Sequence, residues 1–170
     1  MLLIYAAISF AASLTHFLSP RATRLRLVDL GVDPNDIVVP DAILQQATWT
    51  AISGTLLAIL LAVGTFGLFA SAGWARNILR GWAVLTVLRT AILLLAAYLS
   101  VDTAAAFQYR VQTLQREALT ASGTEIPPNV LDRDEASIRE TGTRRLAAVG
   151  LLPAIVPAII LLAYRRPNAG

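Results

Sequence analysis

One charged side chain lies inside a long apolar stretch of this chain. Arg89 stands near the middle of residues 82–101, which contain no other charge. A charge at the centre of a bilayer costs roughly 2.5–3.5 kcal/mol on insertion scales, so such residues usually bind an anion, pair with an acid or serve a pore. The alternative is a span shifted to 90–107, with Arg89 at an interface, but that shift moves Asp102 into the lipid. We therefore predict a buried, functional Arg89.

The sequence supplies oxygen atoms for Arg89 but no obvious carboxylate. No Asp or Glu lies deep in another apolar stretch, and Asp102 is more than three helical turns away on the same stretch. Thr86 and Thr90 flank the arginine. Hydroxyl or backbone acceptors are expected from the preceding apolar stretch, which contains Thr48, Thr50, Ser53, Thr55 and Thr65. We expect no salt bridge within the chain at this position.

Other residues that could do chemistry form weak patterns. His16 is the only histidine and the chain has no Cys, so a metal site is not expected. Asp33, Asn35, Asp36 and Asp41 lack the spacing and closing Glu of a calcium loop, which favours turn and cap roles. The chain contains no P-loop, G-x-S-x-G or H-E-x-x-H motif. We predict no catalytic residue, no metal and no cofactor.

Small residues spaced four apart predict close helix packing. Such rows let two helix backbones approach in a membrane. They are Gly67 and Ser71 in one stretch, and Gly150, Ala154 and Ala158 in another. Pro153 and Pro157 are expected to bend the second of these helices, because each removes a backbone donor. Broken helices occur at ion sites of transporters, but ordinary packing kinks are more frequent.

Composition indicates a membrane protein. Of the 170 residues, 56% are hydrophobic and only 15% are charged, against about a quarter in soluble domains. Most of the charges lie in two blocks, roughly 21–41 and 102–145. All basic residues are Arg, which an excess of G and C in the genome explains most simply. Because these Arg residues are mixed with acids and flank apolar spans, we expect a lipid bilayer as partner and no nucleic acid.

Four apolar stretches approach the roughly 20 helical residues that cross a bilayer. They are residues 2–18, 47–72, 82–101 and 146–164, joined by loops 19–46 and 102–145 and by a short turn. The first is read as a retained helix, since it lacks the basic start of a signal peptide. Trp74 and Trp82 are expected as interfacial anchors. The predicted fold is all-α: one polytopic domain, 1–170, with a four-transmembrane-helix bundle.

The first loop begins with helix signals. Ser19 is a good N-cap with Pro20 at the first helical position, and Gly31 is a plausible stop. This segment predicts either an amphipathic helix at the headgroup level or a polar connector. In the amphipathic interpretation, lipid headgroups are contacted by Arg21, Arg24 and Arg26.

The third apolar stretch predicts a helix that extends beyond the membrane to about Ala121. Apolar residues continue there at spacings of four, three and four, namely Phe107, Val111, Leu114 and Ala118. A second amphipathic stretch, 134–145, leads into the last span. We therefore expect a helical hairpin outside the membrane, formed by extensions of the third and fourth helices.

Arginine counts give a preferred topology. Loops one and three carry nine Arg, whereas loop two and the tail carry four. The positive-inside rule then places the hairpin in the cytoplasm and both termini outside. The same two loops also hold all eleven acids, which weighs against this assignment. The expected location is the cell membrane, in multi-pass form, as in a bacterial inner membrane.

Without a catalytic pattern, the sequence favours an interaction protein. The first hypothesis is an accessory, assembly or stabilising subunit of a larger membrane complex, or a homo-oligomer, with Arg89 facing a partner acid. The alternative is a small oligomeric transporter or channel for an anionic or lipid-like substrate. A membrane enzyme or a signalling protein is the remaining possibility.

Overall fold

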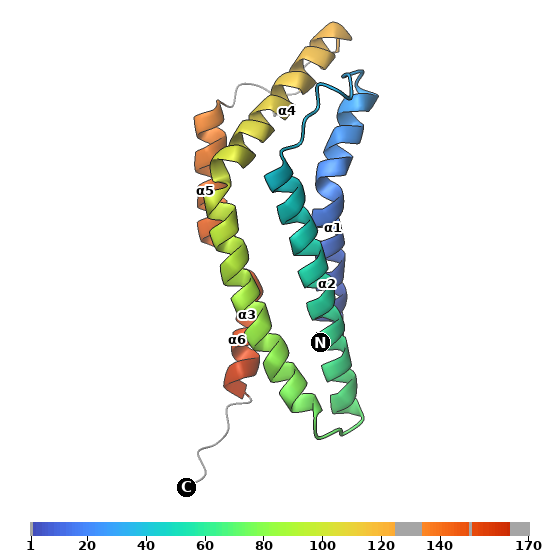
Figure 1. Cartoon of the computed structure of the whole chain (residues 1–170), viewed down its shortest axis with the longest axis vertical. Helices are drawn as coiled ribbons and strands as arrows, with labels where there is room; N and C mark the ends of the chain where they lie inside the picture. Colours follow the sequence, from blue (N-terminus) through green and yellow to red (C-terminus); the bar gives the residue numbers. More distant parts are fainter. Residues whose placement is uncertain (1, 125–133, 150, 164–170) are drawn as a thin grey trace.

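The computed structural model describes residues 2–124, 134–149 and 151–163, and the statements below concern these residues (Figure 1). They form six helices and no strand, as the all-α prediction requires. The helices are α1 (Leu2–Asp29), α2 (Asp41–Phe69), α3 (Ala75–Leu99), α4 (Val101–Ala121), α5 (Glu135–Val149) and α6 (Leu152–Ala163).

Two helices are long and apolar enough to cross a membrane. They are α2 and α3, with 29 and 25 residues and mean hydropathies of 2.1 and 1.9 over their most apolar windows. The two arms of α1, Leu2–Thr15 and Phe17–Asp29, make a third candidate if they are counted as one bent span. Helix α6 is apolar, but its 12 residues reach only about 18 Å, less than the roughly 30 Å hydrocarbon core. The described chain thus has two to three candidate spans.

Helix α1 continues through Pro20 instead of restarting there. We expected Ser19 to cap a new helix, but Pro20 lies inside α1, which runs to Asp29. A proline in a helix leaves the carbonyl four residues earlier without its donor and crowds it. Here that residue is number 16, and the two arms of α1 meet at an angle of 40° at this point. The proline bends the helix without ending it.

Gly31 ends α1 as predicted. Its φ is +88°, a left-handed conformation that glycine adopts without steric cost. The amide of Gly31 donates to the Val28 carbonyl at 2.9 Å, and the amide of Val32 donates to the Leu27 carbonyl at 3.0 Å. These two bonds form a Schellman motif, which satisfies carbonyls at the helix end.

The core lies where α1, α2, α3 and α6 meet. It contains Trp82 of α3, which is only 2% exposed and packs edge-on against the Tyr5 ring at 6.1 Å. We expected Trp82 as an interfacial anchor, and that prediction is wrong, because the ring fills this interior contact. Trp74 is 49% exposed and remains outside the core. The other buried members of the core are Ala6, Leu61, Leu79, Ala83 and Ile160.

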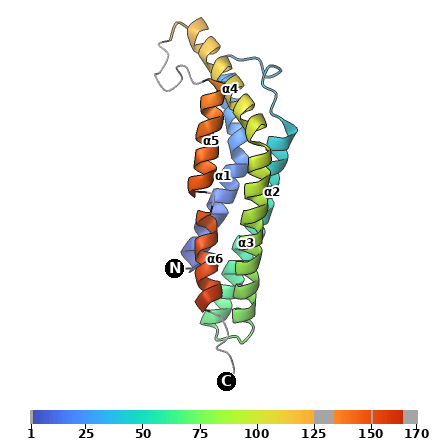
Figure 2. The same cartoon turned by 90° about the vertical axis from the view of Figure 1, so that its left-hand side faces the viewer.

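Helices α5 and α6 run antiparallel to the α3–α4 arm (Figure 2). Helix α4 follows α3 after Ser100 and leans away from its direction (Figure 1). Helix α5 packs on α4, where the Arg139 Nε lies 2.8 Å from an Asp102 carboxylate oxygen. Helix α6 packs on α3 in line with α5. The predicted hairpin of 102–145 is therefore present over its described helices.

Candidate functional site

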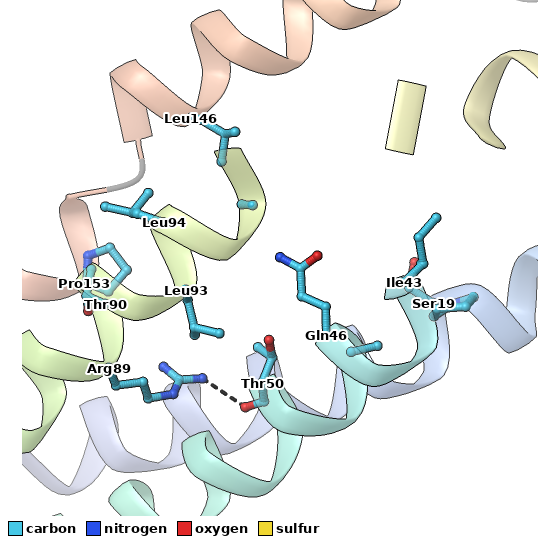
Figure 3. Close-up of a pocket in the computed structure, with 13 residues that line it drawn as sticks. Ser19, Ile43, Gln46, Thr50, Arg89, Thr90, Leu93, Leu94, Leu146 and Pro153 are labelled. Atoms are coloured by element: carbon cyan, nitrogen blue, oxygen red, sulfur yellow. Dashed lines mark hydrogen bonds between the residues drawn. The ribbon is translucent and has the colours of Figure 1, made fainter. Parts of the chain in front are cut away.

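Arg89 lies in the middle third of α3. Helical rise places it about 21 Å from the first residue of α3 and about 15 Å from the last. Thr86, one helical turn before Arg89, and Thr90, directly after it, are both buried. The side chain points across the bundle to α2, as Figure 3 shows, and is half-buried. Arg89 therefore lies well inside α3, and its depth in a bilayer stays a prediction.

Helix α2 holds the guanidinium through two hydrogen bonds. The Arg89 Nε donates to the Ser53 Oγ at 2.7 Å, and its Nη2 donates to the Thr50 carbonyl at 2.8 Å. The Ser53 hydroxyl donates its own hydrogen bond to the Trp49 carbonyl at 2.6 Å, so the lone pairs of its oxygen can accept the bond from Arg89. Of the five α2 residues named as possible acceptors, Thr50 and Ser53 perform this role.

Gly54 lets three elements meet at the arginine. A Cβ at this position would collide with the Ser13 Oγ of α1 and lie 3.0 Å from the Arg89 Nη2. Only a residue without a side chain therefore allows α1, α2 and the guanidinium to approach so closely. We did not select Gly54 from the sequence. Its spacing of four from Ala58, also buried, is the small-residue signal that identifies it.

Arg89 retains hydrogen-bonding capacity that the described chain does not use. A guanidinium has five N–H groups, and two of them are accounted for above. Neither of the ion pairs between described residues, Asp102 with Arg139 and Glu140 with Arg144, involves Arg89. No fully buried polar side-chain atom in the described structure lacks a partner, so the Arg89 Nη1, which makes no hydrogen bond with the described residues, is not fully buried.

Two cavities border Arg89. The first has a volume of about 430 Å³ and extends from Arg89 toward Pro20 and Leu146. The second, about 420 Å³, extends toward Tyr5 and Trp82. In both, Arg89 is the only charged residue among the described residues that form the wall. Both volumes fall within the roughly 300–1,000 Å³ of small-molecule sites.

Most of the hydroxyls around these cavities are committed to their own helices. Ser13, Thr86 and Thr90 each donate to the carbonyl four residues earlier, at 2.8 Å. Such hydroxyls can still accept a hydrogen bond but have no hydrogen left to donate. Tyr5 donates to the Pro153 carbonyl at 3.4 Å and so joins α1 to the start of α6. Arg89 is consequently the main donor.

The predicted proline and small-residue positions do not all lie near Arg89. Pro153 borders both cavities, and Pro157 is buried inside α6. Ala154 is half-buried and Ala158 is exposed, so this row is only partly covered within the described chain. Gly150, the first residue of the row, lies outside the described residues.

Gly67 and Ser71 lie at the other end of α2. Gly67 is buried, and a Cβ there would lie 2.5 Å from the Trp74 ring. Ser71 follows the end of α2 with φ +56° and is exposed. It occupies the left-handed capping position, since the Ala72 amide donates to the Gly67 carbonyl at 2.8 Å. Gly67 therefore packs against Trp74, which directly precedes α3, whereas Ser71 belongs to the turn.

The predicted headgroup residues are exposed along the second arm of α1. The Arg21 guanidinium carbon lies 4.4 Å from the centre of the Phe17 ring, and Arg24 donates to the Pro34 carbonyl at 3.3 Å. Arg26 is in the last turn of the helix. In the following loop the Asn35 amide donates to an Asp33 carboxylate oxygen at 2.8 Å, which is the turn role expected of Asp33. The side chain of His16 lies outside the described residues.

No protein-family model, curated protein or solved structure matches this chain. The function must therefore be argued from the Arg89 site itself.

Proposed function

We propose that this chain is a membrane-embedded binding protein that holds an anionic, lipid-like ligand beside Arg89. The observation that carries the proposal is the state of the guanidinium. Two of its donors are fixed to α2, and the side chain borders a cavity of about 430 Å³ whose wall is mainly aliphatic. A permanently charged group in such surroundings is stabilised by an anion, because low dielectric strengthens their attraction.

The anion has to come from another kind of molecule. All eleven acids of the chain lie between residues 29 and 41 or between 102 and 140, outside the apolar stretches around Arg89. A second copy of the chain has its acids at the same depths, so a homodimer in parallel orientation does not supply a carboxylate at the level of Arg89. A ligand or a different protein remains.

The direction of Arg89 favours a ligand over a partner helix. The side chain points inward to Thr50 and Ser53, and its cavities lie between helices of the same chain. An acid on a neighbouring helix would have to project its side chain into this open cavity between α1, α2, α3 and α5 to reach it. A small amphiphile can enter between them, as in other sites between helices of bundles. This is the reason for placing the ligand-binding alternative first.

The membrane arrangement we propose has four spans. The end of α5 and the whole of α6 together run along α3, since Leu146 and Pro153 both border the first cavity with residues of α3. They form a fourth span that is interrupted at the level of Arg89. Interrupted spans at binding sites are a recurrent feature of transporters. The chain is proposed as a multi-pass protein of a cell membrane, and transport of the ligand is one use of such a site.

The test is the identity of what the protein retains on purification. The chain is purified in a mild detergent, and bound small molecules are released and identified by mass spectrometry. We expect an acidic amphiphile at close to one per chain. Arg89→Leu should lose it, while Arg89→Lys should retain part of it, because Lys keeps the charge without the guanidinium fork.

The matched control is Arg76→Leu, which removes an exposed arginine from the first turn of the same helix. It should retain the amphiphile fully. A folded Arg89→Leu protein that carries as much acidic amphiphile as the wild type would contradict the proposal.

An accessory-subunit role remains the second candidate. It is supported by Ala158, an exposed small residue on α6 in the predicted row, at which a neighbouring helix can approach. It predicts that one foreign membrane protein co-purifies in fixed ratio. Ala158→Leu should then release that protein while the isolated chain stays folded. Ala163→Leu, at the exposed end of α6, is the control.

A further inference from the structure

The first cavity contains two more polar side chains that face Arg89. They are Gln46 and Thr50, both on α2 and one helical turn apart, so their Cβ atoms lie about 5–6 Å from each other on one face. Figure 3 shows both side chains directed into the space between α2 and α3, with Arg89 on the opposite side. Neither residue was selected from the sequence for a role in ligand binding.

Thr50 has an uncommitted hydroxyl. Its backbone carbonyl accepts from Arg89, but its Oγ1 makes no hydrogen bond within the part of the chain that the structure describes. This distinguishes it from Ser53 and Thr90, whose hydrogens go to carbonyls of their own helices. The Thr50 hydroxyl can therefore donate to a ligand in the cavity.

Gln46 is positioned by Ser100 at the junction of α3 and α4. The Ser100 Oγ lies 3.2 Å from the Gln46 Oε1, and its one hydrogen is shared between that oxygen and the Ala96 carbonyl, which is 2.9 Å away. With its oxygen engaged there, the amide directs its nitrogen toward the Leu93 and Leu94 side of the cavity (Figure 3). The two N–H groups of this nitrogen are additional donors, and Ser100 is a positioning residue for them.

We propose that Arg89, Thr50 and Gln46 together bind the oxyanion of a single-headed amphiphile, either a carboxylate or a phosphate. Such a group offers several lone pairs and is best held by multiple donors, of which one is charged. This inference rests on the proposed function and names the chemistry of its ligand.

The rest of the wall indicates why the ligand has an apolar part. Around the three donors, the first cavity is bordered mainly by aliphatic side chains, including Ile43, Leu93, Leu94 and Leu146. A free inorganic ion would leave this surface without a partner, whereas an acyl chain covers it and gains packing contacts with these side chains.

The same wall indicates a preference for acidic over zwitterionic heads. Among its described residues there is no carboxylate to receive a choline or ammonium group, and Arg89 would repel one. The site therefore favours acidic lipids in two ways: its donors bind the oxyanion, and the Arg89 charge repels the cationic group of a zwitterionic lipid.

The experiment measures binding of radiolabelled oleate, a single-chain carboxylate, to the full chain in nanodiscs of phosphatidylcholine, with empty nanodiscs subtracted. Gln46→Leu and Thr50→Val should each weaken oleate binding about tenfold, because each removes one hydrogen bond to a charged group. Thr50→Ser keeps the hydroxyl and should bind like the wild type.

Two neighbours on α2 provide matched controls. Gln45 and Thr48 are exposed and do not border the cavity, and the Thr48 hydroxyl donates to the Leu44 carbonyl. Gln45→Leu and Thr48→Val should change the affinity by less than twofold.

The outcomes separate this inference from the proposed function. If Arg89→Leu abolishes binding but Gln46→Leu and Thr50→Val do not weaken it, the three-donor site is refuted and ligand binding at Arg89 stands. If Arg89→Leu binds oleate like the wild type, both fail. Inorganic phosphate that displaces oleate at equal concentration would overturn the need for an apolar chain. A co-purifying protein that is released by Arg89→Leu, without oleate binding, would assign the site to a partner's acid.

Discussion

Gly54→Ala adds one methyl group where α1, α2 and Arg89 meet. The new Cβ would collide with the Ser13 Oγ and lie 3.0 Å from both the Ser13 Cβ and the Arg89 Nη2. Real Cβ atoms do not come this close to such neighbours, so α1 must move away from α2 or Ser13 must change its rotamer. A rotamer change would break the hydrogen bond from the Ser13 Oγ to the Ser9 carbonyl, and a shift of α1 would open the packing around Arg89.

Two opposing effects determine how much Gly54→Ala changes the free energy of unfolding. Overpacking of this kind costs about 1–3 kcal/mol, and the contact with Ser13 is short enough to favour the upper half of that range. Replacing a helical Gly with Ala returns about 1 kcal/mol through propensity. We expect a net loss of about 1–2 kcal/mol in the free energy of unfolding. Gly81, with no atom within 4 Å of its Cβ position, should lose nothing when changed to Ala.

The assay is titration of the purified protein with sodium dodecyl sulfate, followed by circular dichroism. Ser13→Gly removes the atoms with which the new methyl collides, so the double variant should recover most of the loss. The expected coupling between positions 13 and 54 is about 1–2 kcal/mol. If Gly54→Ala is as stable as Gly81→Ala and shows no coupling with Ser13, the proposed close approach of α1 and α2 is refuted.

Three further predictions follow from the fold. Ser71→Gly should raise the free energy of unfolding by up to about 1 kcal/mol in the same titration, because Ser71 has φ +56°, a left-handed conformation that glycine adopts more easily. A loss of stability would contradict the assignment of Ser71 to the helix cap. Ile138→Asp should lower stability by about 2 kcal/mol or more by placing a carboxylate where a 6% exposed side chain packs, whereas the exposed Ala136→Asp should be tolerated. The Arg count places the α4–α5 hairpin in the cytoplasm, so single cysteines at Gly73 and Ser122 should lie on opposite sides of the membrane. An impermeant maleimide applied to intact cells should then label only position 73. Labelling of position 122 alone would reverse the topology.

Local chemistry was sufficient to predict several features of this protein. The all-α class and the apolar stretches follow from hydropathy along the chain, which does not depend on neighbours in space. The stop at Gly31 and the turn at Asp33 follow from the conformations that these residue types adopt. The position of Arg89 in the middle third of α3 follows from counting residues along one helix.

Other features depended on how the helices face one another. Pro20 can begin a helix or bend one, and only packing on both sides of the bend keeps α1 continuous. Trp82 has the side chain of an interfacial anchor, but the direction of its helix face buries it against Tyr5. Ser71 has the spacing of a packing residue, yet the chain leaves the helix before reaching it.

The Arg89 site shows the same division most clearly. The sequence determined that a guanidinium interrupts an apolar stretch and that no carboxylate lies deep in any other apolar stretch, because residue type and distance along the chain are local properties. It offered five α2 residues as partners and gave no reason to choose among them. Tertiary structure selected Thr50 and Ser53, required Gly54 beside them and directed Gln46 into the same cavity. The physical reason is that helical periodicity defines the faces of a helix, but only contact with its neighbours decides which face turns inward.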